Sequence, residues 1–213
     1  MPTRVYDSRT DIANLLAHPE IRGRFMRMDP GPASPMHSHD LGGEIFLVLE
    51  GRCEFLIGDE RVTCGPGQLI YVEPRLKHTL HAVGDAPCVL YLSVTPHIEP
   101  THTRYDEGGQ PLPPAYGTWR GKGQADPHPD LATLALAERY GAAARQLADL
   151  ARTNAAIAER CLQRLREGDA ARDQPALKGT IDELWLGLRD MLQQASTLGQ
   201  EWNALAPRAM PPR

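Results

Sequence analysis

The chain has 213 residues, enough for one large domain or for one domain with an appendage. With 41% hydrophobic and 23% charged residues, its composition is that of an ordinary globular protein. The net charge of −4 and the lack of a lysine- or arginine-rich run argue against a nucleic-acid-binding protein. No apolar stretch approaches the roughly 18 residues that span a bilayer, so we expect no membrane partner.

The N-terminal residues and the cysteines indicate the compartment. Residues 1–7 lack the apolar segment of a signal peptide. The cysteines form no C-x-x-C pair and are too sparse for a disulfide framework; they are Cys53, Cys64, Cys88 and Cys161. We therefore expect free thiols and a cytoplasmic location.

The first half of the chain reads mainly as β-structure. Residues 10–17 could form a short helix, capped by Thr10 and ended by His18-Pro19. Short strand-like segments then follow one another, separated by turns that contain Gly, Pro or Asp. These segments are 24–28, 44–50, 52–57, 61–64, 68–72, 78–83 and 87–95. Short strands at this spacing predict an antiparallel sandwich or barrel.

A group of metal-binding side chains lies within this region. His37-Ser38-His39 and Glu44 occur between Gly31 and Gly51. Side chains of an extended strand repeat every two residues, so both imidazoles point to the same face. Gly42-Gly43 allows the turn that brings Glu44 to the same point. Two imidazoles and a carboxylate are ligands that suit a divalent transition metal.

This spacing resembles the first motif of the cupin superfamily, G-x5-H-x-H-x4-E-x6-G, and matches it at each specified position. The segment from Gly67 to His78 is similar to the second cupin motif, with Gln68, Arg75 and Ala82 in place of the usual Asp, Gly and Asn. The resemblance covers about residues 22 to 96. It implies a double-stranded β-helix whose cavity holds a metal ion, and it adds a fourth ligand. The implied ligand set is His37, His39, Glu44 and His78.

The ligand set indicates the kind of metal and reaction. Four protein ligands on an octahedral ion leave two adjacent positions open for water, dioxygen or a bidentate substrate. We expect one divalent transition metal ion, Fe(II) by preference, with Zn, Mn or Ni as alternatives. The preferred hypothesis is a mononuclear Fe(II) oxygenase-type enzyme, a dioxygenase-like oxidoreductase, acting on a small organic substrate. The alternatives are a non-catalytic metal- or ligand-binding cupin and a non-redox isomerase or lyase using Zn, Mn or Ni.

Other site residues are less well defined by the sequence. The cavity wall would include the apolar side chains Phe46, Val48, Phe55 and Ile57. His97 and His102 lie just beyond the last strand, and each could be a general base, a substrate anchor or an ordinary loop residue. No residue outside the ligands is a convincing acid, base or substrate anchor. The catalytic residues and the substrate therefore stay unknown at this stage.

The second half of the chain changes character. Residues 97–129 are rich in proline and glycine and show no periodicity, which indicates a linker or a lid. Within residues 130–205, apolar positions recur at spacings of four and three. The first series is Leu136, Tyr140, Ala143, Leu147, Leu150, Asn154, Ile157 and Cys161. The second is Leu177, Ile181, Leu184, Leu188, Met191, Ala195, Leu198 and Trp202. This pattern predicts two helices that form an antiparallel hairpin.

The predicted fold is mainly β: a double-stranded β-helix followed by a C-terminal α-helical hairpin. Its parts are residues 1–96, the barrel with a short N-terminal helix; residues 97–129, the linker or lid; and residues 130–205, the hairpin. Each helix offers more apolar surface than one partner helix covers. We therefore expect a homodimer through a four-helix bundle, the alternative being a hairpin that folds back on its own barrel. The other expected partner is a small-molecule substrate or ligand.

Overall fold

The computed structural model describes residues 3–117, 128–167 and 173–210. The strands are β1 (Asn14–Ala17), β2 (Arg22–Met28), β3 (His37–Ser38), β4 (Gly43–Glu50), β5 (Cys53–Ile57), β6 (Glu60–Cys64), β7 (Leu69–Val72), β8 (His78–Ala82), β9 (Cys88–Thr95) and β10 (Thr103–Arg104). The helices are α1 (Thr133–Arg166) and α3 (Gln174–Leu205), followed by the 3-10 turn η1 (Ala206–Ala209). Two compact units result, one of residues 1–127 with 206–213 and the other of residues 128–205.

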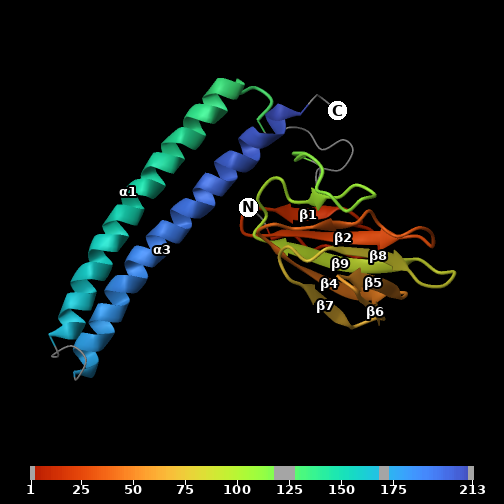
Figure 1. The fold of residues 1–213 in the computed structure, drawn as a ribbon, viewed down its shortest axis with the longest axis horizontal. Coiled ribbons are helices and arrows are strands. Elements are labelled where there is room, and N and C mark those ends of the chain that lie inside the picture. Colours follow the sequence, from red (N-terminus) through yellow and green to blue (C-terminus); the bar gives the residue numbers. More distant parts are fainter. Residues whose placement is uncertain (1–2, 118–127, 168–172, 211–213) are drawn as a thin grey trace. The chain divides into compact units, whose positions relative to one another are not determined.

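The strands form two five-stranded antiparallel sheets (Figure 1). Their orders are β1-β2-β9-β4-β7 and β10-β3-β8-β5-β6. Buried side chains from both sheets make one core, in which the rings of Phe46 on β4 and Phe55 on β5 lie 5.2 Å apart. β4 and β5 turn alternate residues toward this core, as the period of two predicts. The predicted fold class, a mainly β domain followed by an α-helical hairpin, is confirmed.

The predicted N-terminal helix over residues 10–17 is wrong. Residues 14–17 are the edge strand β1, which pairs antiparallel with β2. A tight turn with two backbone hydrogen bonds between His18 and Ile21 folds β1 back onto β2. The amide of Phe25 also donates to the carbonyl of Ala13, at 3.1 Å. Pairing with the sheet edge satisfies backbone groups that a short, isolated helix would leave largely to water.

The stretch predicted as a linker or lid is partly ordered onto the barrel. Within it, β10 pairs with β3, and Tyr105 forms a bridge with Pro111. The hydroxyl groups of Tyr105 and Ser38 lie 2.7 Å apart, which ties the stretch to the strand that carries His37. Within this stretch, β10 therefore extends the second sheet at its β3 edge. The remainder of the stretch, residues 118–127, lies outside the described residues.

The hairpin is an antiparallel pair of long helices. The predicted series on α1 faces α3, with Leu136, Ala143 and Cys161 buried. Ion pairs join Arg139 to Glu201 at 2.8 Å and Arg160 to Glu183 at 3.0 Å. Neither of these described helices combines the length and apolar character that a membrane crossing requires.

The contact face of α3 differs in part from the predicted series: Trp202 packs against Tyr140 of α1 as predicted, with ring centroids 5.8 Å apart, but other positions do not. Thr180 and Gln194 are buried, and Gln194 Nε2 donates to the carbonyl of Ala143 on α1 at 3.1 Å. Gly187, halfway between them, faces Asn154 of α1. Ile181 and Leu188, which the prediction placed in the contact, are exposed. The small and polar residues allow close approach to α1, and they lie beside the half-buried Leu184 and Met191 of the predicted series.

Candidate metal centre

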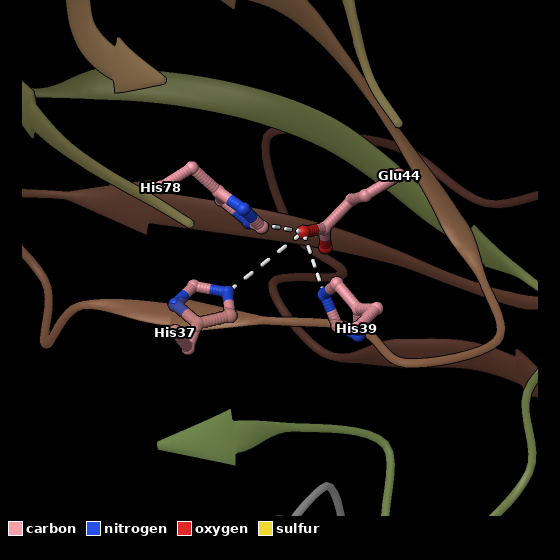
Figure 2. Close-up of side chains that lie close together, drawn as sticks. All are labelled: His37, His39, Glu44 and His78. Carbon is pink, nitrogen blue, oxygen red and sulfur yellow. Dashed lines mark hydrogen bonds and ion pairs between the residues drawn. The ribbon is translucent and has the colours of Figure 1, made fainter. Parts of the chain in front are cut away.

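The four side chains of the implied ligand set come together inside the barrel. His37 begins β3 and pairs in register with His78, the first residue of β8. His39 lies just past the end of β3, and Glu44 is the second residue of β4. One donor atom from each residue lies within 4.8 Å of the others, in an arrangement that could hold a metal ion (Figure 2).

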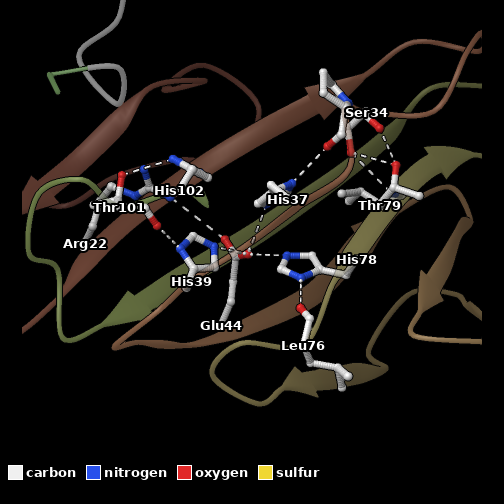
Figure 3. Close-up of polar contacts among 12 residues, drawn as sticks. Arg22, Ser34, His37, His39, Glu44, Leu76, His78, Thr79, Thr101 and His102 are labelled. Carbon is white, nitrogen blue, oxygen red and sulfur yellow. Dashed lines mark hydrogen bonds and ion pairs between the residues drawn. The ribbon is translucent and has the colours of Figure 1, made fainter. Parts of the chain in front are cut away.

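Each of the three imidazoles is oriented by a backbone carbonyl. His37 Nδ1 donates to the carbonyl of Pro35 at 3.0 Å, and His78 Nδ1 donates to that of Leu76 at 2.9 Å. His39 Nδ1 donates to the carbonyl of Thr101 (Figure 3). A carbonyl only accepts, so the proton of each ring is on Nδ1 and the lone pair is on Nε2. Such outer partners fix the ring orientation of metal-binding histidines.

The free Nε2 atoms converge on one carboxylate oxygen. Glu44 Oε2 lies 2.9 Å from His39 Nε2 and 3.0 Å from His78 Nε2. His37 Nε2 is 3.8 Å from the same oxygen. Three lone pairs and a carboxylate oxygen cannot satisfy one another, so they need either extra protons or a cation between them. The donor set, three nitrogens and one oxygen, therefore fits a divalent transition metal.

The groups around Glu44 keep its carboxylate ionised. Burial by itself raises the pKa of Glu44, but its contacts with the three histidines together hold it well below its usual value. On the other side, Arg22 of β2 is also buried, with a guanidinium nitrogen 3.9 Å from Glu44 Oε1. Burial lowers the pKa of Arg22, and the nearby Glu44 opposes that effect. The carboxylate is thus kept ionised, the form that binds a cation.

His102 also reaches the cluster. Its ring centroid lies 5.0 Å from that of His37 and 4.8 Å from that of His39. Thr101 Oγ1 lies 3.0 Å from His102 Nδ1. Burial, together with the charges of His39 and Arg22, lowers the pKa of His102 to about 2, so the ring is neutral. His102 is therefore a neutral imidazole next to two of the candidate ligands.

His97 is buried, and burial lowers its pKa to about 3. Sequence reasoning named His97 and His102 without placing them, and it missed Arg22 and Thr101 altogether. Neither belongs to a motif: Thr101 reaches His39 across 62 residues. No local pattern around them could have found this contact.

Solvent access is uneven around the cluster. The His37 side chain is 14% exposed, while those of His39 and Glu44 are 3% exposed and that of His78 is 1% exposed. Three of the predicted cavity-wall residues are fully buried in the core, namely Phe46, Val48 and Phe55, and Ile57 is half-buried against them. The Phe46 ring lies 6.1 Å from that of His78. A small molecule would therefore approach from the side of His37.

A comparison with protein families gives the assignment. A family model described as a cupin domain matches residues 24–95 of the chain, which contain all four side chains of the cluster. Residues 24–95 are a cupin domain. In this domain the first motif supplies His37, His39 and Glu44, and His78 comes from the second.

The cupin domain also has similar regions in other proteins. A protein of Methanocaldococcus jannaschii, described as uncharacterized, is 29% identical over 68 residues, which are 32% of this chain and 54% of that protein. The chain thus spans about half the length of that relative. A double-stranded β-helix protein of Klebsiella pneumoniae has 17% identity and a TM-score of 0.42, covering 45% of this chain and 91% of that one. A cupin 2 conserved barrel domain protein of Salinispora arenicola has 23% identity and a TM-score of 0.37, covering 45% and 88%. None of these names states a reaction or a ligand.

Proposed function

We propose that the protein is a metal-dependent cupin enzyme that holds one divalent ion through His37, His39, Glu44 and His78. The preferred ion is Fe(II), and the preferred activity is of the mononuclear oxygenase type, on a small organic substrate. The observation that carries this proposal is the convergence of three Nε2 lone pairs on one carboxylate oxygen, with every Nδ1 proton already committed to a backbone carbonyl.

The chemistry divides between the ion and the chain. A bound Fe(II) would supply redox reactivity toward dioxygen and a substrate held side by side. The carbonyls of Pro35, Leu76 and Thr101 hold the imidazoles in place, so the donor atoms need little rearrangement. Exposure of His37 leaves that side for substrate entry, and the His102 ring, 5.0 Å from that of His37, is kept neutral there by its lowered pKa.

The second candidate is a non-redox isomerase or lyase that uses Zn, Mn or Ni as a Lewis acid. The same observation supports it, because three imidazoles and a carboxylate also suit these ions. A cupin that binds metal or ligand without catalysis is the third. Metal identity and oxygen consumption together separate the three.

The first experiment uses protein purified without a histidine tag. Metal is measured per chain, and oxygen uptake is followed with a panel of small organic compounds. About one Fe per chain with compound-dependent oxygen uptake supports the oxygenase. Zn, Mn or Ni with conversion of a compound and no oxygen uptake favours the Lewis-acid enzyme. Metal without any conversion favours the binding protein. No metal under metal-replete conditions contradicts both enzymes and the metal-binding protein, and it favours a cupin that binds a ligand without metal.

A variant pair tests the ligand assignment. We expect His39→Ala to weaken metal binding by more than the roughly 10- to 100-fold that loss of an outer partner costs. His81→Ala is the control, because His81 also lies on β8 but is 4.0 Å from Glu54 and outside the cluster. Metal at 1,000 times its Kd stabilises the folded state by about 4 kcal/mol, so chelation should lower the Tm of wild type and His81→Ala but not of His39→Ala. Equal melting of wild type with and without chelator contradicts the assignment.

The expected assembly and location are also proposals. We propose that the hairpin joins two copies of the chain into a homodimer, supported by large apolar side chains that are exposed on α3. We place the protein in the cytoplasm, supported by four cysteines that are all buried and free.

A further inference from the structure

Helix α3 carries a row of large apolar side chains that the described part of the hairpin leaves substantially exposed. Ile181 is 51% exposed, Trp185 56%, Leu188 39% and Leu192 53%. Their spacing of four, three and four places them on one face of the helix. Contiguous apolar surface of this kind is unusual on a free surface and marks an interaction site. We call these four residues the apolar row.

The apolar row is separate from the face that meets α1. That face uses Thr180, Gly187 and Gln194, which recur every seven residues. The helix therefore has two contact faces, one built for close approach to α1 and one built of large side chains.

The apolar row is complementary to itself when reversed. Its four-three-four spacing reads the same in both directions along the helix. Two copies of α3 in antiparallel orientation therefore place Ile181 against the partner's Leu192 and Trp185 against the partner's Leu188. A surface that matches its own copy after a half-turn is what a twofold-symmetric interface requires.

The charges beside the apolar row agree with the same pairing. Asp182 and Arg189 lie seven residues apart on one flank of the row, each directly after one of its members. Reversal of the second helix brings Asp182 of each copy near the partner's Arg189. Within one copy, Asp182 pairs with Lys178 and Arg189 with Asp190, all on the exposed surface where pairs exchange easily.

We propose that α3 pairs with α3 of a second copy in antiparallel orientation through the apolar row. This inference rests on the proposed homodimer and specifies its face, its direction and its register. The antiparallel pair leaves both α1 helices on the same side of the interface, away from the apolar row. Each cupin domain keeps its own complete cluster, because all four side chains come from one chain.

The first test is sedimentation of the full-length protein. We expect wild type to be a dimer and Leu188→Glu to be a monomer with unchanged metal content. Leu186→Glu is the matched control, since Leu186 is 47% exposed on the same helix but outside the row, and it should remain a dimer. A monomeric wild type overturns both the dimer and its face. A dimeric Leu188→Glu overturns the face alone. Metal content in the same samples reports on the proposed function separately.

The second test exchanges the charges of Asp182 and Arg189 to test the antiparallel register of the two α3 helices. Asp182→Arg and Arg189→Asp each create two like-charge contacts across the antiparallel interface, and each should raise the dimer Kd by about tenfold. The double variant restores the pairing, so its Kd should return to near the wild-type value. If the effects came only from the pairs within one helix, the double variant would be weaker than either single variant. That result would overturn the antiparallel register.

Discussion

Arg75 is the only described residue other than glycine with a positive φ, at 69°. Its amide donates to the carbonyl of His39 at 2.7 Å, so this backbone conformation supports the loop that carries a candidate ligand. The second cupin motif usually has glycine at this position, and here the left-handed conformation is kept with a side chain present. The left-handed conformation costs a residue with a Cβ about 1–2 kcal/mol. Glycine avoids this strain, but it loses more conformational entropy on folding, which offsets part of the gain.

We therefore expect Arg75→Gly to stabilise the protein by about 1 kcal/mol and to raise the Tm by roughly 2–4 °C. Gly67→Ala is the reverse control, because Gly67 has φ 80° and a Cβ there would meet no atom within 4 Å. Strain alone should then lower its Tm. Thermal unfolding followed by circular dichroism measures both. A lower Tm for Arg75→Gly would mean that contacts of the Arg75 side chain outweigh the strain.

His97 predicts how stability depends on pH. Burial, with the charges of Arg22 and His39, lowers its pKa to about 3 in the folded state, against 6.5 for an ordinary histidine. Between these values the unfolded chain binds a proton at His97 that the folded chain does not. The contribution of the neutral His97 ring to folding stability is therefore complete above pH 6.5 and is lost as pH falls toward 3.

For one such group, the free energy of unfolding should fall by about 2 kcal/mol between pH 7 and pH 5. Urea unfolding of chelated protein at the two pH values measures the loss, and His97→Gln should reduce it by about this amount. An unchanged loss in the variant would show that His97 does not remain neutral in the folded state.

The site could be predicted only as far as its motifs reach. His37, His39 and Glu44 lie within eight residues, and His78 follows at a spacing that the family resemblance supplied. Arg22 and Thr101 could not be predicted, because their contacts with the cluster depend on how β2 and the residues after β9 fold around it. Candidate ligands that follow a local spacing can be predicted from sequence. The residues that orient those ligands or balance their charge are brought to them only by the tertiary structure.

At the scale of elements, α3 predicts a difference between two glycines. A Cβ on Gly187 would lie 2.5 Å from Asn154 Oδ1 and 3.2 Å from Ile157 Cδ1, whereas one on Gly179 would meet nothing within 4 Å. Alanine in a helix interior is favoured over glycine by up to about 1 kcal/mol. Gly179→Ala should therefore stabilise the hairpin, and Gly187→Ala should not.

Asn154 provides the matched control for this pair. Asn154→Ala removes the atom nearest to the added Cβ, so Gly187→Ala made in that background should recover most of the gain. Chemical unfolding of the four variants measures the coupling between the two positions. Equal stabilisation by Gly179→Ala and Gly187→Ala would contradict the close approach of the helices at Gly187.

The elements that were predicted correctly carry a strong period. The strands β4 and β5 alternate buried and more exposed residues, and α1 keeps its seam from Leu136 to Cys161. The incorrect predictions concern segments whose residue pattern fits two different structures equally well. The apolar positions of residues 10–17 fit a helix as well as an edge strand, and only the turn at His18 and pairing with β2 decide. On α3, apolar size alone placed Ile181 and Leu188 in the contact with α1, although both are exposed, whereas Trp202 does reach Tyr140.

At the scale of the whole molecule, the candidate metal centre is contained in one unit. The four candidate ligands, together with Arg22 and His102, all belong to the unit of residues 1–127 and 206–213. No side chain of the described hairpin belongs to the metal-binding cluster. Metal binding and self-association are therefore expected to be separable, and deletion of the hairpin tests this directly.

We expect a chain ended near Ala125 to bind one metal ion per chain and to sediment as a monomer. The deletion also removes the short segment 206–213 of the same unit, including the buried Ala206, so some loss of Tm is expected. Full-length Leu188→Glu is the control, since it keeps this segment and should also be monomeric with metal bound. A truncated chain that remains a dimer would show that the barrel supplies the interface. In that case α3 would have a different partner, and its apolar row would be free to pack against the barrel of its own chain.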